Sequence, residues 1–201
     1  MPRIAEARPG AEPSSPEQRA RHVRILDAAA QLAAERGLDR VQMQEVAKAA
    51  GVAIGTLYRY FPSKTHLFTA VMAEQIDRLE KQPPRRRPDT TPEEAVFEVL
   101  VSAHRNLLRR PALATAMIQS VNAAHAATVT DVGRIDSGFH ELLLRAWGLD
   151  DPTLSEVNRI RLLVLLWYGV LQSSLNGRSS APEAEADLRL ACTLLLAPET
   201  D

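Results

Sequence analysis

The sequence has few of the features that mark a secreted or membrane protein. Its 201 residues include a single cysteine, Cys192, so no disulfide can form within the chain. An unpaired thiol fits a reducing compartment. No apolar run approaches the roughly 20 residues that a membrane-spanning helix needs, and residues 1–10 lack the hydrophobic segment of a secretory signal. We therefore expect a cytoplasmic protein.

Motifs of the common enzyme classes and metal sites are also missing. There is no Ser-His-Asp arrangement, HExxH, CxxC or phosphate-cradling glycine loop. The five histidines show no spacing that would place a metal site on one helix face. Cys192 has no neighbouring base, so we expect an inert, packed thiol. These absences predict a protein that is not an enzyme and holds neither metal nor cofactor.

Aromatic residues are scarce, at 4% of the chain, whereas Ala and Leu are abundant, and that composition favours helices over strands. Apolar periodicity and cap residues predict an all-α fold. A capping box at 91–94 is expected to open one helix, and Asp151 with Pro152 to cap another. The prolines of residues 82–90 predict a linker. The expected helices cover about 16–36, two short segments within 41–64, about 63–81, one from 91, then 113–123, 130–147, one from 152 that stops at 177, and 182–197.

The stretch from Val41 to Lys64 is the most informative part of the chain. Val46 and Ala47 give its first short helix an apolar face, and Leu57 does the same for the second. Between them, Gly51 occupies the position where the chain must reverse, which favours a residue free to take positive φ. This pattern is typical of a helix-turn-helix, whose second helix enters the major groove of DNA.

Residues 51–64, read as GVAIGTLYRYFPSK, resemble the signature of the TetR/AcrR family of transcriptional regulators. The resemblance covers about residues 19–79. It implies an N-terminal three-helix helix-turn-helix DNA-binding domain (the head, 17–66) and a C-terminal helical ligand-binding and dimerisation domain (the body, 67–201). Residues 1–16 show no periodicity and are expected to be a disordered tail.

The resemblance also assigns contacts in the head. Residues that match base-facing positions are Gln44, Ile54, Gly55 and Thr56. Residues that match phosphate-facing positions are Tyr58, Tyr60 and Lys64. Ile54 departs from the family pattern because some relatives have a polar base reader there; its side chain suits a thymine methyl or no base at all.

Charge is distributed unevenly along the chain. Residues 1–88 contain 15 Lys and Arg against 10 Asp and Glu, a balance of +5, whereas residues 89–201 have a balance of −6. A basic head on an acidic body fits a protein that brings only its head to DNA. The basic residues Arg19, Arg21, His22 and Arg24 either form an arm that reaches the duplex or are a solvated start of the first helix.

The body is expected to bind a ligand and to dimerise. Residues 161–175 are apolar nearly all round, and the last helix carries a second apolar stripe, so these two helices are predicted to form a homodimer interface. Four features carry a further resemblance: the lead-in at 41–43, the stretch YRYFPSKTHL at 58–67, the RPAL junction at 110–113 with Ala116 and Met117, and the helix that contains Trp167. In these features the chain resembles the steroid-catabolism repressors of the same family. That resemblance implies an elongated hydrophobic effector such as a steroid or an acyl-CoA thioester. The expected pocket residues are Leu107, Met117, Ser120, Val121, Phe139, Leu143, Trp147, Trp167 and Leu171.

These expectations combine into one interpretation. The chain is predicted to be a repressor that binds a palindromic double-stranded operator as a homodimer and is released by a hydrophobic small molecule. The alternative is an architectural DNA-binding protein without an inducer, which a body with no ligand-dependent release would favour.

Overall fold

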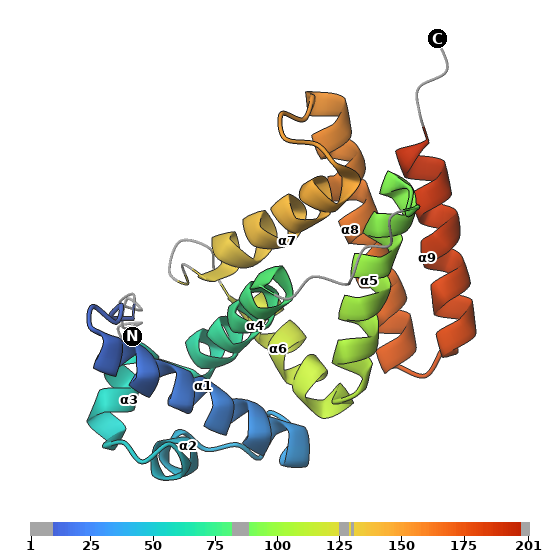
Figure 1. The fold of residues 1–201 in the computed structure, drawn as a ribbon. Coiled ribbons are helices and arrows are strands. Elements are labelled where there is room, and N and C mark those ends of the chain that lie inside the picture. The colour runs from blue at the N-terminus through green and yellow to red at the C-terminus, as the bar shows by residue number, and fades with distance from the viewer. Residues whose placement is uncertain (1–9, 82–88, 125–128, 130, 198–201) are drawn as a thin grey trace, which may run out of the picture. The chain divides into compact units, whose positions relative to one another are not determined.

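The computed structural model describes residues 10–81, 89–124, 129 and 131–197. Every regular element within these residues is a helix, which confirms the all-α fold class (Figure 1). Most of the predicted linker at 82–90, and most of the Ala-rich stretch before residue 131, lie outside the described residues. The helices are α1 (Pro16–Arg36), α2 (Met43–Ala49), α3 (Ile54–Tyr60), α4 (Lys64–Lys81), α5 (Pro92–Leu108), α6 (Pro111–Ala123), α7 (Asp131–Trp147), α8 (Leu154–Leu175) and α9 (Ala181–Leu196).

Helix α1 has the predicted bounds because its sequence specifies both ends. The Ser15 hydroxyl accepts a hydrogen bond from the Gln18 N–H at 3.2 Å, and Pro16 occupies the first helical position, where a missing N–H costs nothing. Gly37 ends the helix with φ of 76°. On the inner face, Ile25 and Ala29 are fully buried.

The turn between α2 and α3 is a Schellman motif centred on Gly51. Gly51 has φ of 65°, a left-handed conformation that glycine adopts without strain. Its N–H donates to the Lys48 carbonyl at 3.2 Å, and the Val52 N–H donates to the Ala47 carbonyl at 3.0 Å. These two bonds satisfy carbonyls that the end of α2 would leave open, and they confirm the predicted reversal at Gly51.

The helices form two compact units. Unit 1 consists of the described chain up to Ile76 together with the described part of 110–135. Within it, α1 packs against both α2 and α6, and α2 packs against α3. Its fully buried side chains include Leu57 and Phe68. The predicted boundary at residue 66 falls inside α4 and stays a prediction.

Unit 2 consists of the described parts of 77–109 and 136–201. Helices α5, α8 and α9 pack against one another. Leu100, Leu163 and Leu188 are fully buried, and each such side chain stabilises the fold by about 1.5–3 kcal/mol relative to exposure. None of the described helices is long and apolar enough to cross a membrane.

The structure differs from the predicted cap residue at α8 and from the predicted role of Glu94 at α5. Helix α8 is capped by Thr153 rather than by Asp151 and Pro152: the Glu156 N–H donates to the Thr153 hydroxyl at 3.3 Å, and the Thr153 N–H donates to the Glu156 carboxylate at 2.7 Å. Thr153 is the residue placed three before a glutamate, as a capping box requires. At α5, Thr91 caps as predicted, but the Glu94 carboxylate accepts from Arg189 Nη1 at 2.6 Å.

Candidate nucleic-acid interface

Helix α3 has one anchored face and one exposed face. Leu57 is fully buried and anchors α3 in unit 1. Two other large side chains of this helix are exposed: Ile54 by 39% and Tyr58 by 47%. Gly55 lies between them, and a Cβ there would meet no atom within 4 Å. The exposed backbone at Gly55 is therefore open to close approach by a ligand.

The other predicted contacts lie around this face. Gln44 is exposed on α2, and Thr56 is partly exposed on α3. Lys64 opens α4, and its Nζ donates to the Leu38 carbonyl at 3.0 Å. The Ser63 hydroxyl accepts from the His66 N–H at 3.3 Å, which confirms Ser63 as the predicted N-cap of α4. Lys64 therefore adds its own positive charge near the N-terminus of α4, where anions are already favoured.

Tyr60 is placed differently from the other predicted contact residues. It is only 3% exposed, and its hydroxyl accepts a hydrogen bond from Arg59 Nη2 at 3.1 Å. The Arg59 guanidinium also lies 5.0 Å from the centre of the Tyr60 ring. The side chain of Tyr60 thus packs the end of α3, and its expected phosphate contact stays a prediction.

His22 packs against aromatic side chains, a role that we did not predict from the sequence. Its ring lies edge-on to Tyr60, with 5.7 Å between ring centres, and 4.8 Å from the ring of Phe61. Burial lowers the pKa of His22 below its ordinary value, against the opposing carboxylates of Asp131 and Glu74. His22 is therefore a neutral packing group at neutral pH rather than part of a basic arm. The spacing of His22, Ile25 and Ala29 continues the buried stripe of α1 and could have indicated this role.

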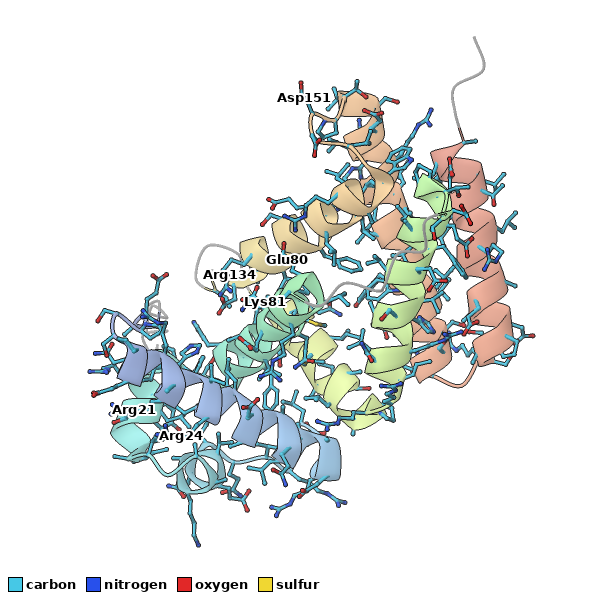
Figure 2. The ribbon with its side chains drawn as sticks, viewed as in Figure 1. Arg21, Arg24, Glu80, Lys81, Arg134 and Asp151 are labelled. Atoms are coloured by element: carbon cyan, nitrogen blue, oxygen red, sulfur yellow. The ribbon has the colours of Figure 1, made fainter. Side chains whose placement is uncertain are left out.

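The remaining basic residues of the predicted arm belong to the first turns of α1. Arg19 and Arg24 are exposed and Arg21 is partly exposed; Arg21 and Arg24 both extend from α1 (Figure 2). They add positive charge to the unit that contains α2 and α3, in keeping with the basic balance of the first 88 residues.

The sequence of this chain matches two known protein families. The family described as bacterial regulatory proteins, tetR family, matches residues 25–71, and the family described as tetracyclin repressor-like, C-terminal domain, matches residues 90–195. The chain belongs to the TetR family of transcriptional regulators. The predicted family, and the order of a helix-turn-helix domain followed by a helical C-terminal domain, are therefore confirmed.

Individual relatives extend the match over nearly the whole regulator. The HTH-type transcriptional repressor KstR of Rhodococcus jostii is 37% identical over 186 residues, which are 91% of this chain and 86% of KstR. This similarity confirms the predicted resemblance of the body to that repressor subgroup. A crystal structure of a TetR transcriptional regulator from Rhodococcus sp. RHA1 is 60% identical, has a TM-score of 0.82, and covers 90% of this chain and 97% of that chain.

A more distant solved structure agrees in fold alone. FadR from Bacillus subtilis, solved in complex with stearoyl-CoA, has a TM-score of 0.56 at 21% identity and covers 86% of this chain and 98% of that chain.

The predicted effector residues are distributed over both units of the regulator. In unit 1, Met117 and Ser120 are buried on α6, and Val121 is half-buried. In unit 2, Leu143 and Leu171 are buried, and Leu107 and Trp147 are half-buried. The rings of Phe139 and Trp167 are 5.0 Å apart between centres, and the indole N–H of Trp167 donates to the Leu100 carbonyl at 3.2 Å. Their role in binding an effector stays a prediction.

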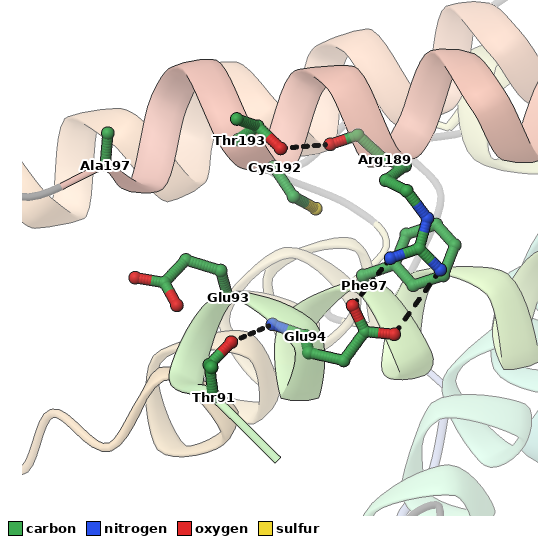
Figure 3. A pocket seen from close by; sticks show the side chains of 8 residues that line it. All are labelled: Thr91, Glu93, Glu94, Phe97, Arg189, Cys192, Thr193 and Ala197. Atoms are coloured by element: carbon green, nitrogen blue, oxygen red, sulfur yellow. Dashed lines mark hydrogen bonds and ion pairs between the residues drawn. The ribbon is translucent and has the colours of Figure 1, made fainter.

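A separate cavity of about 330 Å³ lies between α5 and α9 in unit 2 (Figure 3). None of the predicted effector residues lines it. The Arg189 guanidinium lies 3.9 Å from the centre of the Phe97 ring and is paired with Glu94. Burial raises the pKa of Cys192, which also lines the cavity, to about 12. Its thiol therefore stays protonated at neutral pH, as expected for an unreactive cysteine.

Proposed function

We propose that the regulator is a repressor that binds a palindromic operator as a homodimer and leaves it when a hydrophobic effector occupies the body. The observation that carries this proposal is the exposed face of α3. Ile54, Gly55 and Tyr58 are exposed while Leu57 is fully buried, which is the arrangement needed for a helix that is fixed on one side and reads DNA on the other.

The contact residues divide into two roles in this proposal. Gln44, Ile54, Gly55 and Thr56 face the base edges, where hydroxyl, amide and methyl groups can discriminate sequences. Tyr58 and Lys64 hold phosphates, which fixes the register of α3 without conveying sequence. Tyr60 contributes to phosphate binding indirectly, because its hydroxyl accepts a hydrogen bond from Arg59 and so positions that guanidinium.

The division between these roles predicts different effects of substitution. Lys64→Ala and Tyr58→Phe are expected to weaken binding to operator and to unrelated DNA by a similar factor, and Lys64→Ala should lower the slope of log affinity against log salt by about one unit. Thr56→Ala is expected to change the ranking of operator variants while keeping the salt slope. Fluorescence anisotropy over a salt series with the operator and single-base variants measures both quantities.

The matched control is Lys48→Ala, which removes an exposed lysine from the last turn of α2. It should change affinity less than Lys64→Ala. An unchanged affinity and salt slope for Lys64→Ala would contradict the phosphate assignment.

The homodimer is proposed to form through α8 and α9. These helices bury one face within unit 2 but carry large apolar side chains that are exposed in the single chain: Leu165 is 58% exposed, Leu190 58% and Leu194 70%. Leu162 and Leu166 on α8 are 45% and 39% exposed. Exposed apolar groups on neighbouring helices favour association with a second copy, and two-fold symmetry matches a palindromic site.

The effector is proposed to be an elongated hydrophobic molecule, such as a steroid or an acyl-CoA thioester. The predicted pocket residues are mostly aliphatic or aromatic, with Ser120 as a polar group that can orient a ligand. FadR, which shares the fold, was solved with stearoyl-CoA. Helix α6, which carries Met117, Ser120 and Val121, packs against α1, so an effector on α6 would act on the helix that supports α2.

Effector binding can be tested by release of bound operator. Stearoyl-CoA or a steroid CoA thioester is expected to lower operator affinity by a factor within the usual range of allosteric coupling, about 5- to 150-fold, while acetyl-CoA has little effect. Val121→Phe should weaken this response but keep operator affinity, because Val121 is half-buried on α6 and a larger ring narrows the site. Equal operator affinity with and without every hydrophobic thioester would favour a DNA-binding protein without an inducer.

A further inference from the structure

The chain just before α1 is attached to the end of α3. The Ala11 N–H donates to the Arg59 carbonyl at 2.9 Å. Gly10 lies so close to the Tyr60 carbonyl that a Cβ at residue 10 would overlap its oxygen, and the same Cβ would be 3.6 Å from Pro62 Cδ. Residues 10–15, called the strap below, thus bring the chain from the end of α3 to the first turn of α1.

Both ends of the strap are hydrogen-bonded. At its α1 end, the Ser14 N–H donates to the Gln18 side-chain oxygen at 2.9 Å, and the Ser15 hydroxyl caps α1. At its α3 end, the Ala11 N–H satisfies one of the carbonyls that a helix terminus leaves open. The strap therefore links two helices that are separated by 17 residues of sequence.

Helix α3 needs such support because it is short. It has seven residues, and an isolated helix of that length is unstable in water, so its conformation depends on tertiary contacts. At its C-terminal end these contacts include the strap and the ring of His22, which packs on Tyr60 and Phe61. At its N-terminal end α3 follows the tight turn at Gly51.

Residue 10 must be glycine because there is no space for a Cβ beside the Tyr60 carbonyl. The added methyl group would meet backbone, which cannot move aside as a flexible side chain would. Either the strap must leave the Tyr60 carbonyl or the end of α3 must shift.

We propose that Gly10 and the Ala11 N–H are positioning elements for DNA recognition, holding the C-terminal end of α3 in the orientation that engages the operator. This inference rests on the proposed function of α3. The strap touches backbone atoms of Arg59 and Tyr60 and acts through α3. Loss of the strap lowers the population of correctly oriented α3, and apparent affinity falls by the same factor.

Two variants remove the attachment by different means. Gly10→Ala introduces the overlap with the Tyr60 carbonyl, and Ala11→Pro removes the donor of the hydrogen bond. Ala11→Ser is the matched control because it keeps the N–H and changes only an exposed side chain. Gly133→Ala is the second control, since a Cβ there meets no atom within 4 Å.

The first readout is hydrogen exchange of residues 54–61 in the absence of DNA. Gly10→Ala and Ala11→Pro are expected to speed exchange of these amides, while both controls match wild type. The second readout is operator affinity, expected to fall about fivefold for each of the two variants, the factor that corresponds to one net hydrogen bond. Melting temperature and oligomeric state are expected to stay close to wild type.

The two readouts separate failure of this inference from failure of the proposed function. Wild-type exchange rates in both variants would show that the strap does not stabilise α3. Faster exchange with unchanged operator affinity would show that the strap stabilises α3 but has no role in DNA recognition. If wild type itself selects no DNA sequence, the proposed function fails, and with it the role in recognition, whereas the exchange data still decide whether the strap holds α3. If one variant does not fold, the other decides.

Discussion

Replacing Leu165 and Leu194 by glutamate is expected to convert the regulator from a dimer into a monomer and to lower operator affinity by about a hundredfold or more. Both side chains are more than half exposed in the single chain, so the substitutions leave the core of unit 2 intact. In the proposed dimer they would bury two unpaired carboxylates per protomer, which is strongly unfavourable. A palindromic site would then be bound by one head at a time, without the gain of about 10²- to 10⁴-fold that linked binding provides.

Light scattering after size-exclusion chromatography measures the mass, and anisotropy measures the affinity. The matched control is Leu165→Met with Leu194→Met, which keeps an apolar surface of similar volume and should stay dimeric with wild-type affinity. A glutamate variant that remains dimeric would contradict the α8–α9 interface. A monomeric variant that binds the operator as tightly as wild type would contradict binding as a dimer.

Leu57→Ala is expected to reduce the free energy of unfolding by about 2–5 kcal/mol, the range for truncating a fully buried leucine. Leu57 is completely buried on α3, and the short helix has few other apolar anchors because Ile54 and Tyr58 are exposed. Operator binding should be lost at temperatures where wild type still binds, because Leu57 anchors α3 in unit 1.

Thr56→Ala provides the comparison for Leu57→Ala on the same helix. Thr56 is partly exposed, so its truncation is expected to change stability by no more than about 0.5 kcal/mol while altering sequence preference. Urea unfolding followed by circular dichroism measures both variants. Equal stability losses at residues 56 and 57 would mean that α3 does not have the anchored and exposed faces described above.

Local sequence signals were sufficient where a few neighbouring residues determine the structure. Ser15, Pro16 and Gly37 specified α1, and Gly51 specified the turn of the helix-turn-helix, because caps and left-handed positions depend on residues within one turn. The cap of α8 was assigned wrongly to Asp151 and Pro152. The Thr153–Glu156 spacing was present in the sequence and fits the capping box better.

Contacts between distant residues were not predictable in the same way. Glu94 was expected to complete a capping box with Thr91, but its carboxylate pairs with Arg189, which is 95 positions away. Tyr60 matched a phosphate-facing position of the family, yet it is buried against His22. The attachment of Gly10 and Ala11 to α3 has no local signature, because it joins backbone atoms almost 50 residues apart. Periodicity along one helix does not reveal which other helix or segment covers its face.

Affinity selection of fragmented genomic DNA by the purified regulator, followed by sequencing, tests whether the protein recognises a palindromic operator. We expect enrichment of an inverted repeat whose half-sites are separated by one helical turn of DNA, ~34–36 Å. Loss of that enrichment in the Lys64→Ala and Leu165→Glu/Leu194→Glu variants would show that operator selection depends on α4 and on the dimer. Uniform recovery of fragments with no shared motif would contradict sequence-specific repression and support an architectural DNA-binding protein instead.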